Sequence, residues 1–163
     1  MSRILYSGLV TRWLSDDEQR AWRRLALVTT LLPASLESQL QRDAGLTHFG
    51  YWVLAMLSEA PGHALRMSEL AALANGSQSR LSHLVSKLEE RGWVRRERVG
   101  DDGRGALAVL TDAGYEKVVA TAPGHVEEVR RLVFDGLTPD QVAALEDVCA
   151  TIAARLTSCD SDP

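Results

Sequence analysis

Residues 66–111 constrain the fold of this 163-residue chain most, because short segments of different periodicity follow one another there without long loops. Residues 67–74 have the apolar spacing of a short amphipathic helix, which we expect Ser68 to open. Asn75-Gly76 follows, and these residue types tolerate the positive φ angles that end a helix. The pattern therefore predicts a helix of two turns followed by a tight turn.

A second helix is predicted over Ser77 to Arg91, where the serine supplies the N-cap. Gly92 then occupies the position after a helix end that glycine favours. Two short strands with partial alternation follow at residues 93–99 and 106–110, and the Gly- and Asp-rich residues 100–105 are typical of a hairpin tip. A helix-turn-helix followed by a β-hairpin is the arrangement of a winged-helix DNA-binding domain.

The second predicted helix has two distinct faces. Leu81, Leu84, Val85 and Leu88 recur at the spacing of one helical face, which we expect to be buried. The other side carries short hydrogen-bonding side chains and cations, which suit base edges and phosphates. These outward residues are Ser79, Arg80, Ser82, His83, Ser86 and Lys87. Exposed helix faces are polar in most proteins, so the helix pattern alone also allows an ordinary solvated surface.

The distribution of charge favours nucleic acid over a solvated surface. Between Ser77 and Arg98 the chain has six cationic and three acidic residues, a segment charge of +3 (6 − 3). The whole chain has a formal net charge of −4, so the remaining residues carry −7 (−4 − 3). A basic patch on an acidic protein confines the attraction for a polyanion to one surface, whereas solvated charge runs interleave both signs.

These residues resemble the MarR family of transcriptional regulators. Residues 77–96 are similar to the family's recognition helix and first wing strand. The stretches Asp102-Gly103-Arg104-Gly105 and Leu110-Thr111-Asp112-Ala113-Gly114 are similar to its wing signature, and the resemblance extends from about Ser15 to Leu156. It implies a homodimer of winged-helix subunits that usually represses transcription until a small molecule or an oxidant releases it. It also implies that Arg104 enters the minor groove, oriented by Asp102.

A twofold dimer would present two recognition helices to successive major grooves of double-stranded DNA. The half-sites of a pseudo-palindromic operator would then lie ~10 base pairs apart. The helix pattern, the basic patch and the resemblance together predict a set of DNA-binding residues. These are Ser68, Ser77, Gln78, Ser79, Arg80, Ser82, His83, Lys87, Arg95, Arg98, Asp102 and Arg104.

Further helices are predicted on both sides of this stretch. Ser15 and Glu18 form a capping-box pattern that starts a helix to about Arg42, which Pro33 should kink. A bend is expected at Pro123-Gly124 in a later helix. The remaining N-cap signals start helices over Thr47–Glu59, Thr111–Phe134 and Thr138–Leu156. In the helix over Thr47–Glu59, the expected core side chains are Phe49, Trp52, Val53, Met56 and Leu57.

The helices at the two ends of the chain have long apolar stripes, for which a second subunit is the expected cover. The buried stripe of the last helix is expected to comprise Val142, Leu145, Val148, Ile152 and Leu156. The predicted fold is mainly α (α+β), with one MarR-type domain over residues 1–163. Within it, residues 13–45 and 112–158 form a helical dimerisation lobe and residues 46–111 a winged helix-turn-helix lobe, in which residues 64–66 add a short strand.

Several classes of protein are disfavoured by the sequence. No apolar run approaches the ~20 residues of a membrane span, and residues 1–12 lack the features of a signal peptide, so we expect a cytoplasmic protein. The common enzyme motifs are absent, and the four histidines lack metal-ligand spacing, so no catalytic residue, metal or cofactor is predicted. Cys149, expected near a buried helix face, and Cys159, in a polar tail, are interpreted as inert thiols.

An effector site is a further hypothesis. Trp22, His48, Tyr51 and Trp52 combine aromatic rings with a few polar groups, which suits a small aromatic acid of the kind that binds in relatives. Tryptophans at helical spacing more often belong to the core, and a single histidine is more often a satisfied polar residue. The alternative to a DNA-binding regulator is an adaptor whose winged helix docks a protein.

Overall fold

The computed structural model describes residues 11–74, 77–99 and 105–159. The predicted turn at Asn75-Gly76 and the hairpin tip with Asp102 and Arg104 lie outside the described residues. The chain divides into two units, Met1–Ala34 and Ser35–Pro163. The helix-turn-helix and the hairpin both belong to the second unit.

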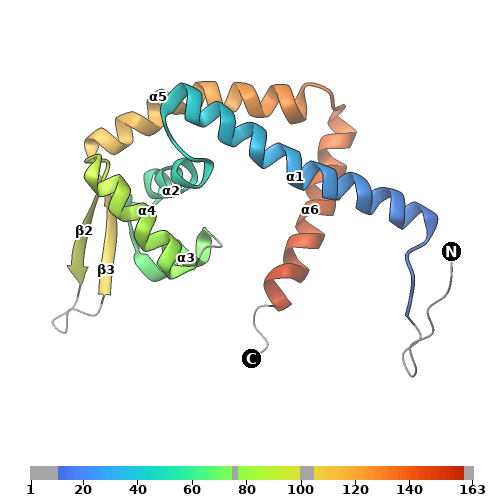
Figure 1. The fold of residues 1–163 in the computed structure, drawn as a ribbon, viewed down its shortest axis with the longest axis horizontal. Helices are drawn as coiled ribbons and strands as arrows, with labels where there is room; N and C mark the ends of the chain where they lie inside the picture. Colours follow the sequence, from blue (N-terminus) through green and yellow to red (C-terminus); the bar gives the residue numbers. More distant parts are fainter. Residues whose placement is uncertain (1–10, 75–76, 100–104, 160–163) are drawn as a thin grey trace. The chain divides into compact units, whose positions relative to one another are not determined.

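The order of elements confirms the predicted helix-turn-helix and hairpin (Figure 1). The helices are α1 (Asp16–Ala44), α2 (His48–Glu59), α3 (Met67–Leu73), α4 (Gln78–Glu90), α5 (Asp112–Val129) and α6 (Pro139–Cys159). A 3-10 turn, η1 (Pro61–His63), precedes the first strand, and a π-helical segment, η2 (Arg130–Phe134), follows α5. The strands are β1 (Ala64–Arg66), β2 (Val94–Val99) and β3 (Gly105–Leu110).

Local capping chemistry explains where most helices begin. The predicted capping hydrogen bonds are present at Ser15, Thr47, Ser77, Thr111 and Thr138. The prediction that Ser68 opens α3 is wrong, because the helix already begins at Met67. There the Glu69 carboxylate accepts the backbone N–H of the N-cap residue Arg66 at 3.1 Å, which is the hydrogen bond that the third helical residue makes in a capping box.

A three-stranded antiparallel sheet of order β1-β3-β2 packs beside the helix-turn-helix. The pairing runs from Val94 opposite Leu110 to Val99 opposite Gly105, so the hairpin is in register along its full described length. The short strand predicted at residues 64–66 is confirmed, and it pairs with β3. Val94 and Leu110 turn into the core, which fixes the base of the hairpin to the helices.

The core of residues 35–163 is built mostly from α2, α3, α4 and the sheet. The predicted inner face of α4 is confirmed, with Leu81, Val85 and Leu88 buried and Leu84 packed against them. Each fully buried leucine contributes about 2 kcal/mol of hydrophobic free energy. The largest side chains with no more than 2% exposure are Leu40, Leu46, Leu54, Leu57, Leu70, Leu81, Val53 and Val85.

Two expectations about burial are wrong. Trp52 is 50% exposed, because Val53, Leu54 and Leu57 define the inner face of α2 and Trp52 points away from it. Cys149 is exposed on α6. The apolar stripe of α6 is uncovered in the single chain, with Val148 53% and Leu156 66% exposed, so its predicted burial against a second subunit stays a prediction.

Neither internal proline ends its helix. Hydrogen-bonded helix continues past Pro33 in α1 and past Pro123 in α5. The regular α-helix instead changes to a π-helical segment at η2, where the Asp135 backbone N–H bonds to the Arg130 carbonyl. This segment was not predicted, and the bend expected at Pro123-Gly124 stays a prediction.

Gly114 provides a test of the packing between α5 and β2. A Cβ atom at this position would lie 2.0 Å from the Trp93 carbonyl oxygen, which already accepts the Thr111 backbone N–H. We expect Gly114→Ala to lower the free energy of unfolding by about 3 kcal/mol, because backbone must move to relieve the clash. Gly136→Ala is the matched control, since its Cβ would meet no atom within 4 Å. Urea unfolding of both variants measures the difference, and equal midpoints would contradict this packing.

Candidate nucleic-acid interface

The polar side of α4 is exposed to solvent because its apolar side is buried. Gln78, Ser79, Arg80, Ser82, His83 and Lys87 are all exposed, as is the N-cap residue Ser77. Ser77 also fixes the start of the helix, where its hydroxyl accepts the Arg80 backbone N–H at 3.2 Å. The side chains predicted from the helix pattern to face outward therefore share one solvent-facing surface.

Arg80 is held at both its backbone and its side chain. Its guanidinium carbon lies 4.3 Å from the centroid of the Phe49 ring, which belongs to the first turn of α2. This distance is within the range of a cation–π interaction. Among the residues that the structure describes, no hydrogen bond or ion pair engages the Arg80 guanidinium, so its N–H groups are available to a ligand.

Arg96 of β2 joins the hairpin to α4, a role that the sequence did not reveal. Its guanidinium pairs with Glu89 at 2.7 Å and donates to the Ser82 carbonyl at 2.6 Å and to the Ser86 hydroxyl at 3.1 Å. Its backbone N–H also donates to Glu89 at 2.8 Å. By sequence, Arg96 is one of the cations of the basic patch. Its contacts instead orient β2 and α4 relative to one another.

The other cations of the patch differ in how they are engaged. Arg95 pairs with Glu97 at 2.6 Å, which partly neutralises it. Arg91 donates to the Gly45 carbonyl and lies over the Trp93 ring. Lys87 and Arg98 are exposed and, within the described part of the chain, have no acidic partner. The cationic charge that remains available to a polyanion therefore comes mainly from Arg80, Lys87 and Arg98.

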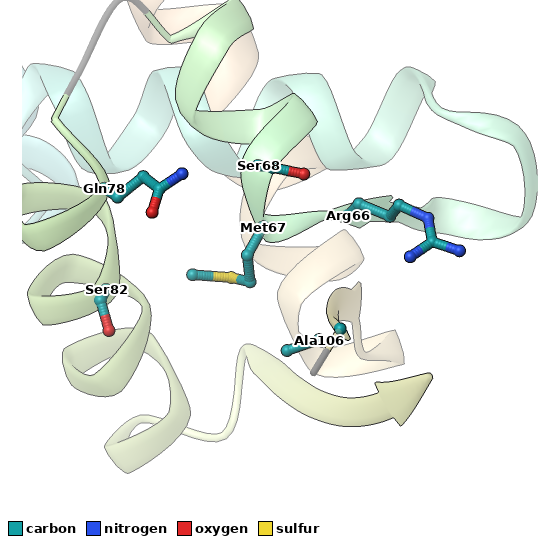
Figure 2. Close-up of a pocket in the computed structure, with 7 residues that line it drawn as sticks. Arg66, Met67, Ser68, Gln78, Ser82 and Ala106 are labelled. Atoms are coloured by element: carbon teal, nitrogen blue, oxygen red, sulfur yellow. The ribbon is translucent and has the colours of Figure 1, made fainter. Parts of the chain in front are cut away.

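A pocket of about 310 Å³ lies between the helix-turn-helix and the start of β3, at the end of the hairpin away from its base (Figure 2). Gln78 and Ser82 project from α4 and Ser68 and Met67 from α3, so three of the predicted DNA-binding residues line one site. The remaining lining residues are Arg66, Gly105 and Ala106. The sequence pattern did not indicate Arg66 as a site residue, because Arg66 precedes the predicted helix. A Cβ atom at Gly105 would lie 3.1 Å from Nη1 of Arg66, so the Arg66 guanidinium lies against the start of β3.

His48 and Tyr51 of the hypothetical effector site meet a histidine that the sequence did not single out. The ring of His125 on α5 lies 4.7 Å from that of Tyr51 and 6.0 Å from that of His48, measured between centroids. Gln39 donates to Asp43 at 2.9 Å, which turns its Oε1 towards His125 Nδ1 at 3.4 Å. Burial lowers the pKa of His125, and the neighbouring His48 lowers it further, which favours the neutral form of the His125 ring.

The two tryptophans of the hypothetical effector site differ from this cluster. Trp52 is half exposed on the outer side of α2, one residue from Tyr51. Trp22 is 58% exposed within the unit of residues 1–34. Among residues 11–74, 77–99 and 105–159, no three His, Cys, Asp or Glu side chains gather as metal ligands would. No helix in these ranges has the length and apolar character needed to cross a membrane.

The role of Arg96 can be separated from that of its neighbour Arg95. Arg96→Met should lower the free energy of unfolding by about 1–3 kcal/mol, because Glu89 and the Ser82 carbonyl lose a charged donor. Arg95→Met should change it by about 0.5 kcal/mol or less, since its ion pair is exposed. Urea titrations followed by circular dichroism test both values. Equal stability of the two variants would show that Arg96 is only another surface cation.

Comparisons with known proteins agree with this geometry. A sequence model described as MarR family matches residues 45–105. Sco3205 from Streptomyces coelicolor, a MarR family transcriptional regulator solved in complex with DNA, is 50% identical, with a TM-score of 0.84 over 88% of this chain and 90% of that chain. AbsC, a MarR family transcriptional regulator from the same organism, is 44% identical, with a TM-score of 0.85 over 91% and 99%.

A third structure, CouR from Rhodococcus jostii RHA1 bound to p-coumaroyl-CoA, is 26% identical, with a TM-score of 0.71 over 88% of this chain and 96% of that chain. The two Streptomyces relatives are regulators and not enzymes, which confirms the class predicted from the sequence. Their identity and coverage extend the resemblance beyond the helix-turn-helix to nearly the whole chain. The chain belongs to the MarR family of winged-helix transcriptional regulators.

Proposed function

We propose that this regulator binds double-stranded DNA through the exposed side of α4 and the adjacent hairpin. The observation that carries the proposal is the pocket in which Ser68, Gln78 and Ser82 meet beside Arg66, between the helix that would enter the major groove and the hairpin. A sugar-phosphate backbone passing between the two grooves would lie there. The complex of Sco3205 with DNA, at 50% identity, supports the same partner.

The side chains then divide by chemistry into two groups. The hydroxyls and amides around the pocket, with Lys87 and Arg98, would contact phosphates and set the register of the protein on the duplex. Arg80 would contact a base edge, since a planar guanidinium can fork the O6 and N7 atoms of guanine. Ser79 and His83 face the same side of α4. From the sequence resemblance, Arg104 would enter the minor groove, oriented by Asp102.

The functional unit is proposed to be a homodimer on a pseudo-palindromic operator. The uncovered stripe on α6 supports this, because contiguous exposed apolar surface marks an interaction site. Its exposed members are Leu145, Val148, Ile152 and Leu156. A twofold pair would place two copies of α4 in successive major grooves, about 10 base pairs apart. Such a regulator would act in the cytoplasm, which is the location we propose.

The dimer is further proposed to repress transcription until an aromatic acid releases it. His48, Tyr51 and His125 form an aromatic cluster that could stack against such a ligand, with Gln39 as a polar contact. The p-coumaroyl-CoA bound to CouR, a more distant relative, supports an aromatic ligand. Trp52, next to Tyr51, and Trp22 remain predicted members of this site.

Salt dependence distinguishes DNA binding from the alternative role as a protein adaptor. Affinity for a duplex with two half-sites should fall steeply with salt, by a slope of about −0.9 for each phosphate contact. Lys87→Gln or Arg98→Gln should each make the salt dependence of a dimer less steep, lowering the magnitude of the slope by about 2, because each removes one phosphate contact per subunit. Arg130→Gln is the control, since Arg130 lies on η2 and pairs with Asp135. Fluorescence anisotropy measures the slopes, and flat or absent binding would favour the adaptor.

Salicylate tests the effector site. At millimolar concentration it should change the tryptophan fluorescence, because Trp52 is next to Tyr51 of the cluster. It should also weaken DNA binding, because two rings of the cluster belong to α2. His125→Leu should reduce both responses, since it removes the ring that faces Tyr51 and His48. If salicylate leaves both signals of the wild-type protein unchanged, this ligand class and placement lose their support.

A further inference from the structure

We propose that Phe49 is a positioning residue for base recognition, because its ring holds the Arg80 guanidinium ready to meet a base. This inference rests on the proposed DNA binding by α4. Phe49 lies on α2, outside the helix-turn-helix, and the sequence pattern gave it only a place in the core. It is partly buried against the core cluster, so its position is fixed before any ligand arrives.

One contact limits how closely α2 approaches α4 beside this ring, and a second fixes the start of α4. Gly50 has no room for a side chain, since a Cβ would lie 2.9 Å from the Thr47 hydroxyl and 3.6 Å from Leu84 on α4. The first turn of α2 is therefore in direct contact with the middle of α4. The Ser77 cap fixes the Arg80 backbone at the other end, at 3.2 Å from the Ser77 hydroxyl to the Arg80 nitrogen. Phe49 then restrains the remaining freedom, which is that of the long arginine side chain.

Stacking suits this role because of the shape of the guanidinium. The group is planar, and its N–H donors lie in the plane. The Arg80 guanidinium carbon lies over the Phe49 ring at 4.3 Å, and its N–H donors, which have no other partner in the described part of the chain, remain available to a guanine. An arginine that is already held loses less conformational freedom when it binds. Phe49 would thus increase discrimination at one base pair without touching DNA.

The same turn of α2 also connects the proposed effector cluster to Arg80. The His48 backbone N–H donates to the Glu37 carboxylate at 2.6 Å, and the Tyr51 ring meets His125. Phe49 lies between these two residues in sequence and faces α4. A change at the cluster that shifts this turn would move the ring under Arg80, so the stack lies on a continuous path from one site to the other.

The test compares Phe49→Leu, which keeps an apolar side chain on the core, with Phe49→Tyr, which keeps the aromatic face. A duplex selected by the wild-type protein from random DNA is changed one base pair at a time, and affinities are measured by anisotropy. Phe49→Leu should lower discrimination at one base pair about 3- to 10-fold, and Phe49→Tyr should restore most of it. In an Arg80→Met background, Phe49→Leu should have no further effect at that base pair.

A second readout in the free protein keeps the result independent of folding defects. The Arg80 side-chain N–H resonance should be shifted upfield by the Phe49 ring in the NMR spectrum of the wild type and of Phe49→Tyr, but not of Phe49→Leu. Unchanged discrimination by a folded Phe49→Leu protein, an equal loss in the Arg80→Met background, or an unshifted Arg80 resonance would each overturn the inference while leaving DNA binding intact. A wild-type protein that selects no duplex would overturn both the inference and the proposed function.

Discussion

The burial of Leu81, Val85 and Leu88 against the rest of the core fixes which side of α4 can meet a ligand. Those three side chains remove one face of the helix from water, and the serines and cations between them are left on the other. The contribution of about 2 kcal/mol from each buried leucine far exceeds that of any exposed ion pair in the patch. Hydrophobic packing therefore determines which side of α4 faces solvent. The charged groups contribute less to this orientation.

Polar contacts then refine that orientation in two places. Arg96 joins the hairpin to α4 through Glu89 and the Ser82 carbonyl, which fixes the spacing between helix and hairpin. At the other end of α4, Phe49 supports Arg80. Both residues act from outside the helix that would contact the bases. In this regulator the arginines of the basic patch accordingly divide into those available to a polyanion and those that hold the interface together.

The uncovered apolar surface of α6 supports the proposed homodimer. A stripe with Val148 and Leu156 more than half exposed is costly to leave in water, and a twofold partner would cover it. The same pairing would bring two reading surfaces to one face of a duplex. Regulation can then act through either the spacing of the two subunits or the stack under Arg80, and the first turn of α2 adjoins the cluster that would sense an effector.

The sequence by itself determined the features that depend on near neighbours. Helix caps at Ser15, Thr47, Ser77, Thr111 and Thr138, the inner face of α4 and the hairpin all follow from residues a few positions apart, where hydrogen-bond geometry and periodicity leave little choice. The failures at Ser68 and Trp52 came from two sources: the helix begins one residue before Ser68, with Glu69 bonded to the N-cap backbone, and an apolar residue was assigned to a core that its angular position cannot reach. Only the tertiary structure decided that Arg96 contacts Ser82, that Phe49 supports Arg80 and that Gln39 meets His125. These contacts join residues 14 and 86 positions apart in the first and last cases, and no local pattern encodes a distance that the packing of separate helices sets.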